Sequence, residues 1–478
     1  MLHSLYTLPK NITAVIVLLT LLRLATAPFF GYGVDEAHYV LYAQHLALSY
    51  FDHPPLVGWV HYLFSFIGHN EFLARVPAIA LGALNSYLFY GLLKDKNKSA
   101  AFWAVIALNA SFVLDVLFLT LMPDSLLISG MLLLIYIVKL LESNNSILNY
   151  LLLGIVLGIM GLSKYTAILF VPGIAGYSIW VRRWDLLLTP KILYTFFFAL
   201  IAISPVLIWN IDNDFSSFTY QASHVVGNEF GNFKNFFLSL TRQFGAYNPF
   251  LFLIAFYGLY KAYRSNDFKL EISLGITILL FMFFSQYRFV ALPHWISPFF
   301  TLFIPIGTYY FYLNQPKGTK IIVSISLILT IIIHLELIAK LGTFPNFNSP
   351  FRDIAGWENA TKQASNELVH LNNKNAALAV THWNLASRAI IYSSHDVFLI
   401  DDRKDQFDLW EKTQPIGKDL LFINPHTYHK DINSSYKCDS TVKIGEYNAT
   451  LNGGIVDVFS YELCKNFTGI RKPSPSIK

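Results

Sequence analysis

The feature that most constrains the fold of this chain is a series of long apolar segments separated by short polar loops. A helix needs about 20 mostly apolar residues to span a bilayer, and about eleven segments meet that need. They are residues 11–30, 72–92, 100–119, 125–141, 147–162, 166–181, 192–209, 246–263, 270–286, 295–313 and 320–340. Only 14% of the residues are charged, against about 25% in soluble proteins. The sequence therefore predicts an α-helical polytopic membrane protein with about 11–13 transmembrane helices.

The basic residues between these segments are distributed unequally, and cytoplasmic loops are the ones that retain Lys and Arg. With a cytoplasmic N-terminus, the inner side holds Lys10, Lys94, Lys96, Lys98, Lys139, Arg182, Arg183, Lys191, Lys261, Arg264, Lys269, Lys317 and Lys320. The outer side holds Arg75, Lys164, Lys234, Arg242 and Arg288. This bias predicts a multi-pass protein of the bacterial inner membrane whose C-terminal part is periplasmic. The net charge of +5 then reflects topology, and no nucleic-acid partner is expected.

The first apolar segment contains one charge, Arg23. A charge at this depth is costly unless it reaches the membrane surface or pairs with an acid. An acid of the first outer loop and a snorkelling side chain are equally consistent with the sequence. The segment also resembles a signal peptide, but it continues to Phe30 and is interrupted by Arg23, so we expect it to be retained.

Two domains are expected, a transmembrane domain over 1–342 and a soluble periplasmic domain over 343–478. The joint, "GTFPNFNSPF" at 342–351, is rich in Gly, Pro and Asn. Beyond it, helical spacing around Trp357 alternates with strand-like runs such as "AALAVTH", "VFLID", "LLFIN" and "GIVDVFSYEL". This alternation predicts a small α/β domain that serves substrate access or support.

Both cysteines of the chain, Cys438 and Cys464, lie in this C-terminal domain. Disulfides persist in oxidising compartments such as the periplasm. We therefore expect the two to form a disulfide, with two free thiols as the alternative.

The first outer loop, 31–71, contains acids and imidazoles at two predicted helix starts. Asp35 and Glu36 begin the first helix, and Asp52 and His53 precede the second, where two prolines suit the first turn. Such short amphipathic helices are expected to lie in the plane of the membrane surface. Both helix starts then place their acids and the His53 imidazole at the same membrane–water boundary.

Other polar residues are expected on the same outer side, namely Asp124, Lys164, Tyr165, Arg288 and His294. Acids there could act as a general base towards a hydroxyl, and Lys, Arg and His could hold an anionic leaving group such as phosphate. A boundary site suits a substrate that is part lipid and part sugar.

Each of these residues also has a purely structural interpretation. Asp35, Asp52 and Asp124 could be helix caps, and Lys164 and Arg288 could anchor span ends. A second alternative is metal binding, since Asp35, Asp52 and Asp124 could hold a divalent ion through oxygen ligands. We expect no obligatory cofactor.

Several stretches together resemble a large bacterial family of polytopic glycosyltransferases. They are "DEAHYVLYAQHLALSYFDHPPLVGW", "MPD" at 122–124, "LSKYT" at 162–166, "WN…SFTYQ…H" over 209–224, "PHW…P" over 293–298 and "DQFDLW" at 405–410. This family is described as dolichyl-phosphate-mannose protein mannosyltransferase-like and includes the lipid A aminoarabinose transferases. The resemblance covers nearly the whole chain in order, and its most specific part is Asp-Glu-Ala-x-Tyr followed by Asp-His-Pro-Pro.

The resemblance implies a fold of the GT-C type and transfer of a sugar from a polyprenyl (undecaprenyl) phosphate with inversion at the anomeric carbon. It implies that Asp35 is the catalytic residue and that Glu36 supports it. Lys164 is implied to bind the donor phosphate, and Asp124 is implied to lie near the site, where it would bind or support the substrate. From their own chemistry and expected side of the membrane, Arg288 and His53 are further candidates for phosphate binding, and Asp52, Tyr165 and His294 for binding or supporting the substrate.

This sequence departs from the aminoarabinose transferases at two places. Asp52-His53-Pro54 stands where those enzymes usually have Glu-Lys-Pro, so a permanent cation is replaced by a titratable imidazole. Leu292 stands where many relatives have an acid before Pro-x-Trp. Both departures put the identity of the sugar and of the acceptor in doubt.

The expected function is therefore transfer of a sugar to a periplasmic acceptor, with lipid A or lipopolysaccharide as the first candidate. A protein O-glycosyltransferase of the same fold is an alternative acceptor class. A lipid or sugar transporter, such as a flippase, is an alternative of another kind, but such proteins place ionisable groups near the bilayer midplane and often contain inverted repeats. A sugar-binding scaffold that has lost catalysis is a third alternative, disfavoured by the intact Asp35-Glu36 pair.

Overall fold

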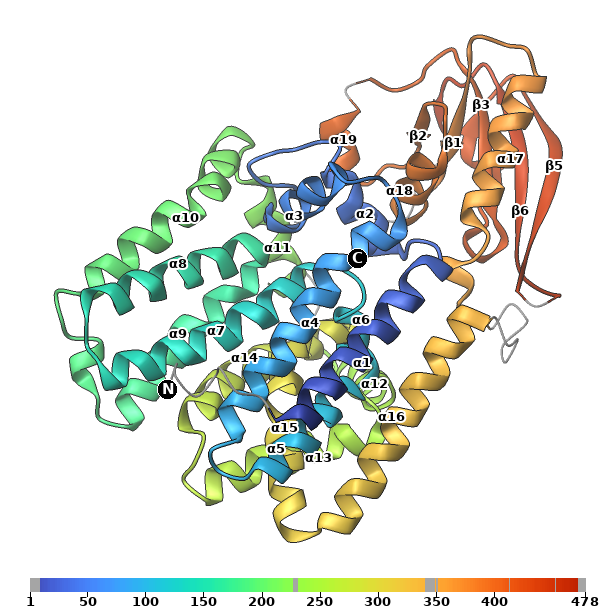
Figure 1. Ribbon diagram of the computed structural model, residues 1–478. Helices are drawn as coiled ribbons and strands as arrows, with labels where there is room; N and C mark the ends of the chain where they lie inside the picture. The colour runs from blue at the N-terminus through green and yellow to red at the C-terminus, as the bar shows by residue number, and fades with distance from the viewer. Residues whose placement is uncertain are drawn as a thin grey trace. The chain divides into compact units, whose positions relative to one another are not determined.

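The computed structural model describes residues 9–226, 231–339, 349, 351–411, 413–451 and 453–471, and side chains at 224–226 are not described (Figure 1). The chain forms two compact units. The membrane unit comprises Met1–Ala25, Ala47–Val60 and Phe72–His334, and the α/β unit comprises Thr26–Leu46, His61–Glu71 and Leu335–Lys478. The expected linear boundary at 342 therefore differs from the division in space, because two parts of the first outer loop group with the C-terminal part. The expected joint at 342–351 lies mostly outside the described residues.

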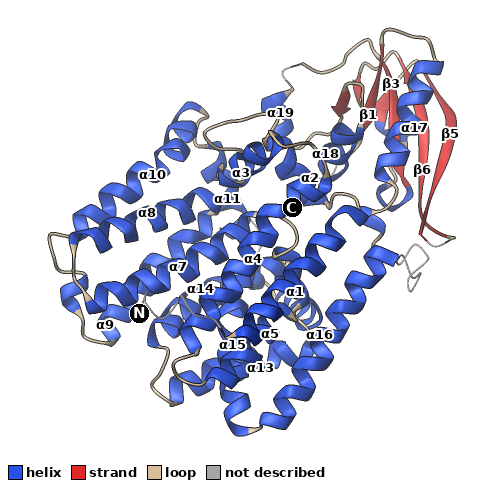
Figure 2. Cartoon of the chain, in the orientation of Figure 1, coloured by secondary structure: helices blue, strands red, loops and turns tan. Residues whose placement is uncertain are grey.

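The membrane unit consists of helices, as Figure 2 shows. They are α1 (Lys10–Thr26), α4 (Glu71–Leu93), α5 (Lys98–Asn109), α6 (Phe112–Leu117), α7 (Pro123–Ser143), α8 (Ile147–Ser163), η3 (Tyr165–Leu169), α9 (Phe170–Trp180), η4 (Trp184–Leu186), α10 (Ile192–Asp212), α11 (Ser216–Val226), α12 (Phe233–Ala246), α13 (Pro249–Arg264), α14 (Lys269–Arg288), η5 (Pro293–Ile296), α15 (Ser297–Asn314) and α16 (Pro316–Ala339). Helix α3 (Leu56–Ser65) passes from this unit into the other.

Seven helical segments among the described residues are long and apolar enough to cross a membrane. Several begin where the sequence supplies a cap or a favourable first residue. Asn97 accepts a hydrogen bond from Ala100 N at 2.9 Å to begin α5, and Pro123 is the first residue of α7, where its missing N–H costs nothing. Three further apolar helical segments are shorter, at Leu56–Ser65, Ile147–Ser163 and Tyr165–Trp180.

The expectation of a single span over 100–119 is wrong, because the chain there forms two helices, α5 and α6. The backbone turns to an extended conformation at Ser111, and the Ala110 carbonyl accepts a hydrogen bond from the Thr330 hydroxyl of α16 at 3.1 Å. The carbonyl left unpaired at the end of α5 is thus satisfied by another helix, and the short α6 begins after the extended residue Ser111.

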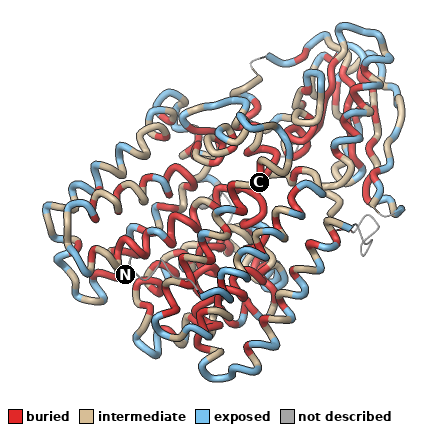
Figure 3. Tube along the Cα trace, viewed as in Figure 1, coloured by how far each residue is buried: buried red, intermediate tan, exposed pale blue. Residues whose placement is uncertain are grey.

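The core of the membrane unit lies around α15, whose residues from Ser297 to Tyr310 are all buried (Figure 3). Its contact with α13 depends on two glycines. A methyl group at Gly307 would lie 1.9 Å from the Ile254 carbonyl oxygen, and one at Gly258 would lie 2.6 Å from Gly307 N. Small residues of this kind let helix backbones approach closely, which is the usual way to stabilise helix pairs in lipid.

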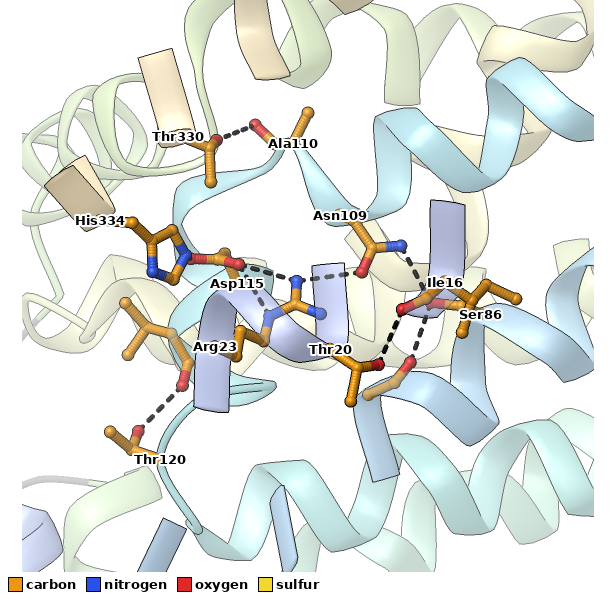
Figure 4. Close-up of polar contacts among 12 residues, drawn as sticks. Ile16, Thr20, Arg23, Ser86, Asn109, Ala110, Asp115, Thr120, Thr330 and His334 are labelled. Carbon is orange, nitrogen blue, oxygen red and sulfur yellow. Dashed lines mark hydrogen bonds and ion pairs between the residues drawn. The ribbon is translucent and has the colours of Figure 1, made fainter. Parts of the chain in front are cut away.

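Arg23 of α1 is buried and forms an ion pair with Asp115 of α6, whose Oδ1 lies 2.7 Å from Arg23 Nη2 (Figure 4). The sequence left two alternatives open for Arg23, an acid of the first outer loop as its partner or a snorkelling side chain. The structure shows instead that Arg23 pairs with Asp115 inside the membrane unit. A charge at membrane depth is tolerated because it is compensated there.

The α/β unit contains a five-stranded sheet in the order β2-β1-β3-β6-β5 (Figure 2). The strands are β1 (Ala376–Val380), β2 (Val397–Leu399), β3 (Asp419–Pro425), β5 (Ser440–Leu451) and β6 (Gly454–Lys465), and a separate pair joins β4 (Tyr436–Lys437) to β7 (Gly469–Ile470). Strands β2, β1 and β3 are parallel, and β6 and β5 continue the sheet antiparallel as a hairpin. The expected strands form, whereas β5 was not expected from the sequence.

One face of the sheet is covered by α17 (Trp357–His370) and α18 (Trp383–Tyr392), and Leu41 of α2 (Val34–Tyr42) joins the same core. The remaining elements of the unit are η2 (Ala27–Phe29), η6 (Arg352–Ile354), α19 (Gln406–Trp410), η7 (His426–Tyr428) and α20 (Ile432–Ser435). The first helix of the outer loop is thus part of this unit rather than an isolated surface helix.

Cys438 and Cys464 form a disulfide, with their Cα atoms 5.4 Å apart, which is the pairing expected from the sequence. The bond joins the short segment between β4 and β5, at Cys438, to β6. It closes the hairpin at the end away from its turn.

Candidate functional site

The centre of the candidate site is an ion pair between Asp124 and Lys164 in the membrane unit. Asp124 lies in the first turn of α7, and Lys164 follows the last residue of α8. Lys164 Nζ donates to Asp124 Oδ1 at 2.7 Å and to Oδ2 at 2.8 Å. The Asp124 side chain is 2% exposed and that of Lys164 10% exposed. A lysine held by two of its three donors still has one proton to offer to another acceptor.

Two residues from the chain beyond α14 complete this centre. His294 of η5 places Nε2 4.0 Å from Asp124 Oδ2, and its side chain remains 19% exposed. Ser297, at the start of α15, places its hydroxyl 3.5 Å from Asp124 Oδ1. The orientation of η5 is fixed in part by Tyr247, whose hydroxyl donates to the Pro293 carbonyl at 3.0 Å. One carboxylate is thus faced by an ammonium group and by an imidazole that can become charged.

The loop that contains Asp52 and His53 belongs to the membrane unit and is held by several contacts. The Asp52 carbonyl accepts from Gln221 Nε2 at 2.6 Å, and the rings of Phe51 and Tyr220 lie 4.7 Å apart. The charges of His53 and Asp124 lie close enough to interact. These contacts with α11 bring the loop to the Asp124 centre.

Tyr165 is also placed at this loop. Its hydroxyl bonds to Ser217 of α11 and lies 3.5 Å from the Ser49 hydroxyl. The membrane unit therefore contains six residues of the expected site in this region, namely Asp52, His53, Asp124, Lys164, Tyr165 and His294.

Arg288 belongs to the same unit and contacts α14 and α12. Its guanidinium group lies 5.8 Å from the ring of Phe284 on its own helix, and its carbonyl accepts from Asn235 Nδ2 at 3.1 Å. Among the cations expected to bind phosphate, Lys164 bonds directly to Asp124.

Asp35 and Glu36 lie on α2 of the α/β unit. Glu36 is buried and accepts a hydrogen bond from Gly33 N at 3.2 Å, which caps the start of the helix. Asp35, next to it, is half-buried, and within the described part of the chain no hydrogen bond or ion pair is assigned to its side chain. A carboxylate without such a partner is free to accept a proton or to contact a substrate.

Helix α2 is fixed by the α/β unit at several places. His38 Nδ1 lies 3.1 Å from the Ser387 hydroxyl of α18, and Tyr32 N donates to the Tyr392 hydroxyl at 3.2 Å. The ring of His45 stacks on Trp410 at 4.5 Å between centroids. Trp410 ends the "DQFDLW" stretch, so this motif has a structural role in holding the first outer loop.

The metal-binding alternative requires Asp35, Asp52 and Asp124 to act together as ligands. Within the described ranges, no three His, Cys, Asp or Glu side chains are grouped so that they could hold a metal ion. Asp124, one of the three acids considered for that role with Asp35 and Asp52, has both carboxylate oxygens bonded to Lys164.

Four hydroxyl-bearing residues near the cluster were not predicted from the sequence, namely Ser49, Ser217, Tyr247 and Ser297. Hydroxyl groups are common throughout membrane helices and have no characteristic spacing. Only the folded chain shows that Ser297 and Tyr247 meet Asp124 and the Pro293 carbonyl.

Comparison with known proteins gives three findings. Residues 52–209 match the family described as dolichyl-phosphate-mannose-protein mannosyltransferase. The lipid A galacturonosyltransferase RgtD of Rhizobium johnstonii is 23% identical over 348 residues, which cover 69% of this chain and 72% of that protein.

The crystal structure of ArnT from Cupriavidus metallidurans bound to undecaprenyl phosphate superposes with a TM-score of 0.62 at 14% identity. The match covers 94% of this chain and 97% of ArnT, and the apo structure of the same protein gives the same values. A match of this extent shows that the chain has the same fold.

Proposed function

We propose that this chain, which belongs to the polytopic membrane glycosyltransferases of the GT-C fold, transfers a sugar from a polyprenyl phosphate to lipid A or lipopolysaccharide. The donor class is supported by the fold shared with ArnT, which was crystallised with undecaprenyl phosphate. The acceptor class is supported by the similarity to a lipid A galacturonosyltransferase. The charge bias of the loops supports a cytoplasmic N-terminus and a periplasmic acceptor.

The observation that carries this proposal is the buried Lys164 ammonium with His294 beside it. The leaving group of the reaction is a polyprenyl phosphate, which gains negative charge as its bond to the sugar breaks. Cationic donors that are already in place stabilise such charge most strongly where water is excluded. Asp124 holds Lys164 in position through two hydrogen bonds. It leaves the third ammonium proton for a phosphate oxygen.

The proposed reaction is a single displacement. An acceptor oxygen attacks the anomeric carbon, the bond from that carbon to the phosphate oxygen breaks, and polyprenyl phosphate leaves with the bonding electrons. The configuration at the anomeric carbon is therefore inverted. With a hydroxyl acceptor, the Asp35 carboxylate takes the proton; with a lipid A phosphate acceptor no proton is removed, and Asp35 orients the acceptor.

The test is transfer by purified Asp35→Asn in detergent, with polyprenyl-phosphate sugar and lipid A as substrates and released polyprenyl phosphate as the readout. We expect a loss of about 100- to 10,000-fold without loss of folded protein. Asp402→Asn, which changes an exposed acid of the same unit, is the matched control and should retain the wild-type rate. Near-wild-type transfer by Asp35→Asn would refute the catalytic assignment.

The acceptor is tested in the same assay by omitting lipid A or replacing it with a periplasmic protein extract. Release of polyprenyl phosphate that depends on lipid A supports the proposal. Release that depends on protein instead would assign the chain to protein O-glycosylation, and no release with any acceptor would favour a transporter.

A further inference from the structure

Asp115 is the centre of a second buried polar network, in the membrane unit, that the proposed chemistry does not use (Figure 4). Its Oδ1 accepts from Arg23 Nε at 3.0 Å and from Arg23 Nη2 at 2.7 Å. Its Oδ2 lies 2.9 Å from His334 Nε2. Arg23 and His334 side chains are each 2% exposed, and that of Asp115 is 9% exposed. One short helix, α6, is thereby tied to both α1 and α16.

The two residues that meet on Asp115 lie where the chain leaves the membrane unit. The unit ends at Ala25, two residues after Arg23, and it ends again at His334 itself. Only 28% of the apolar window of each of α1 and α16 is buried within the described part of the chain, so polar contacts such as this ion pair and the hydrogen bond between Thr330 and Ala110 are among those that hold them. The chain that follows α1 contains Asp35, the proposed catalytic residue. Asp115 therefore holds α1 and α16 close to two of the places where the chain passes from the membrane unit to the α/β unit.

The same hydrogen-bond network also reaches a third helix at which the chain passes between the two units. Arg23 Nη2 also donates to Asn109 Oδ1 at 2.9 Å, and Asn109 Nδ2 donates to the Ser86 hydroxyl of α4 at 2.9 Å. Helix α4 begins at Glu71, the last residue before the chain re-enters the membrane unit. The network thus reaches three of the helices through which the chain passes between units.

In the other direction along the chain, Asp115 is linked to Asp124 through a short and well-fixed segment. Phe118 is fully buried, and a methyl group at Gly82 of α4 would lie 2.7 Å from its Cβ. The Ser125 hydroxyl lies 2.7 Å from the Leu117 carbonyl and 3.2 Å from Met122 N, which fixes the turn before α7. A shift of α6 would therefore be passed to the Asp124–Lys164 pair.

We propose that Asp115 is a positioning residue for glycosyl transfer, because it fixes the connections of the unit that contains Asp35 and the helix that leads to Asp124. This inference rests on the proposed function. Membrane helices can pack through apolar and small residues alone, and a buried ion pair is costly to desolvate. We therefore attribute this buried network to the orientation that it imposes on α1, α6 and α16.

The test is steady-state transfer by Asp115→Asn in detergent. We expect kcat to fall by about 10- to 100-fold while KM for the polyprenyl-phosphate sugar stays within about twofold, since a misplacement of about 1 Å affects the reacting geometry more than substrate binding. A loss of kcat and donor binding together would overturn the positioning role, because it would show general damage to the unit.

Two further variants keep the test independent of folding. Arg23→Gln combined with Asp115→Asn removes the whole pair and leaves no uncompensated charge, so folding should recover while kcat stays low. Glu271→Gln removes another buried interhelical pair, with Lys139 Nζ at 2.9 Å, and should leave kcat within about twofold of wild type. Wild-type kcat in the double variant would overturn the proposal, as would an equal loss of kcat in Glu271→Gln.

Hydrogen exchange gives a readout that needs no turnover. In Asp115→Asn, amides of residues 26–33 and 117–124 should exchange about tenfold faster, whereas Glu271→Gln should leave both segments unchanged. Unchanged exchange in Asp115→Asn would overturn the positioning role even if transfer fell. If the wild-type protein showed no transfer, the proposed function would fail, and the exchange result would still decide whether Asp115 fixes these segments.

Discussion

The two units differ in how they accommodate the charge of a buried carboxylate. In the membrane unit, the buried carboxylates of Asp115, Asp124 and Glu271 each pair with a basic side chain from a distant part of the sequence. In the α/β unit, Asp405 is buried with one carboxylate oxygen bonded to Phe407 N and the other, Oδ2, without a hydrogen-bond partner in the described part of the chain. Its neighbours include further acids, Asp401, Asp408 and Glu411.

This difference follows from what each environment offers to a charge. Inside a membrane unit no water can solvate a carboxylate, so a cation must be built in. In the α/β unit a buried acid can be protonated instead, and burial raises the pKa of Asp405 to about 6 and that of Asp401 to about 7. The paired acids of the membrane unit remain charged, which suits binding and orientation. The acids around Asp405 in the α/β unit change their charge with pH.

Among variants of these buried acids and their partners, the largest effect should come from breaking the pair at the proposed site. Lys164→Met removes the cation offered to the donor phosphate, and we expect transfer to fall about 100- to 1,000-fold. Lys139→Met, which breaks the pair with Glu271, is the matched control and should retain most of the transfer activity. Equal losses in the two variants would show that any buried pair matters only for stability. Transfer of labelled sugar to lipid A measures both.

Stability must be separated from binding in this comparison. Lys164→Met leaves the Asp124 charge uncompensated and should destabilise the unit by about 3–5 kcal/mol. Combining it with Asp124→Asn should restore thermal stability in detergent without restoring transfer. Recovery of transfer in that double variant would contradict a phosphate-binding role for Lys164.

A smaller effect is expected from the acids of the α/β unit. The folded state holds a proton on Asp405 at pH values where the unfolded chain has released it, so the unfolded state binds fewer protons. The free energy of unfolding should then fall as pH rises from 3.8, the ordinary value, through about 6. Asp405→Asn keeps a capping side chain and should raise stability at neutral pH by about 1–3 kcal/mol.

Tryptophan fluorescence during thermal unfolding measures this, because Trp383 and Trp410 lie in the same unit. Asp402→Asn, at an exposed neighbouring acid, should leave the pH dependence unchanged. A pH dependence that survives in Asp405→Asn would assign it to other groups of the unit.

The smallest effect concerns His53, the titratable residue that stands where related transferases usually have Lys. Its charge interacts with that of Asp124, and an imidazole is charged only partly near neutral pH. We expect transfer by the wild type to fall by up to about tenfold between about pH 6 and pH 8, and His53→Lys to flatten this profile. Identical profiles of wild type and variant would exclude His53 from phosphate binding.

Much of this organisation could be predicted from the sequence. Apolar segment lengths predicted the membrane class, and the pairing of Cys438 with Cys464 and four of the five strands of the sheet were expected. Strand β5 was missed because its residues, "STVKIGEYNATL", are mostly polar and exposed, so hydrophobic alternation is weak. The break between α5 and α6 was missed because Thr330, whose hydroxyl bonds to the Ala110 carbonyl at the break, is more than 200 residues away in the sequence.

Residue types and short-range order were thus determined by the sequence itself: the spans, the caps, the acids of the first outer loop and the cations that can bind phosphate. The tertiary structure decided which charges meet. Lys164 pairs with Asp124 because the consecutive helices α7 and α8 pack side by side, and Arg23 pairs with Asp115 because α6 meets α1, which is far from it in the chain. Burial then makes each pairing obligatory, since an unpaired charge inside the unit would cost several kcal/mol. Local sequence patterns contain no information about such partners.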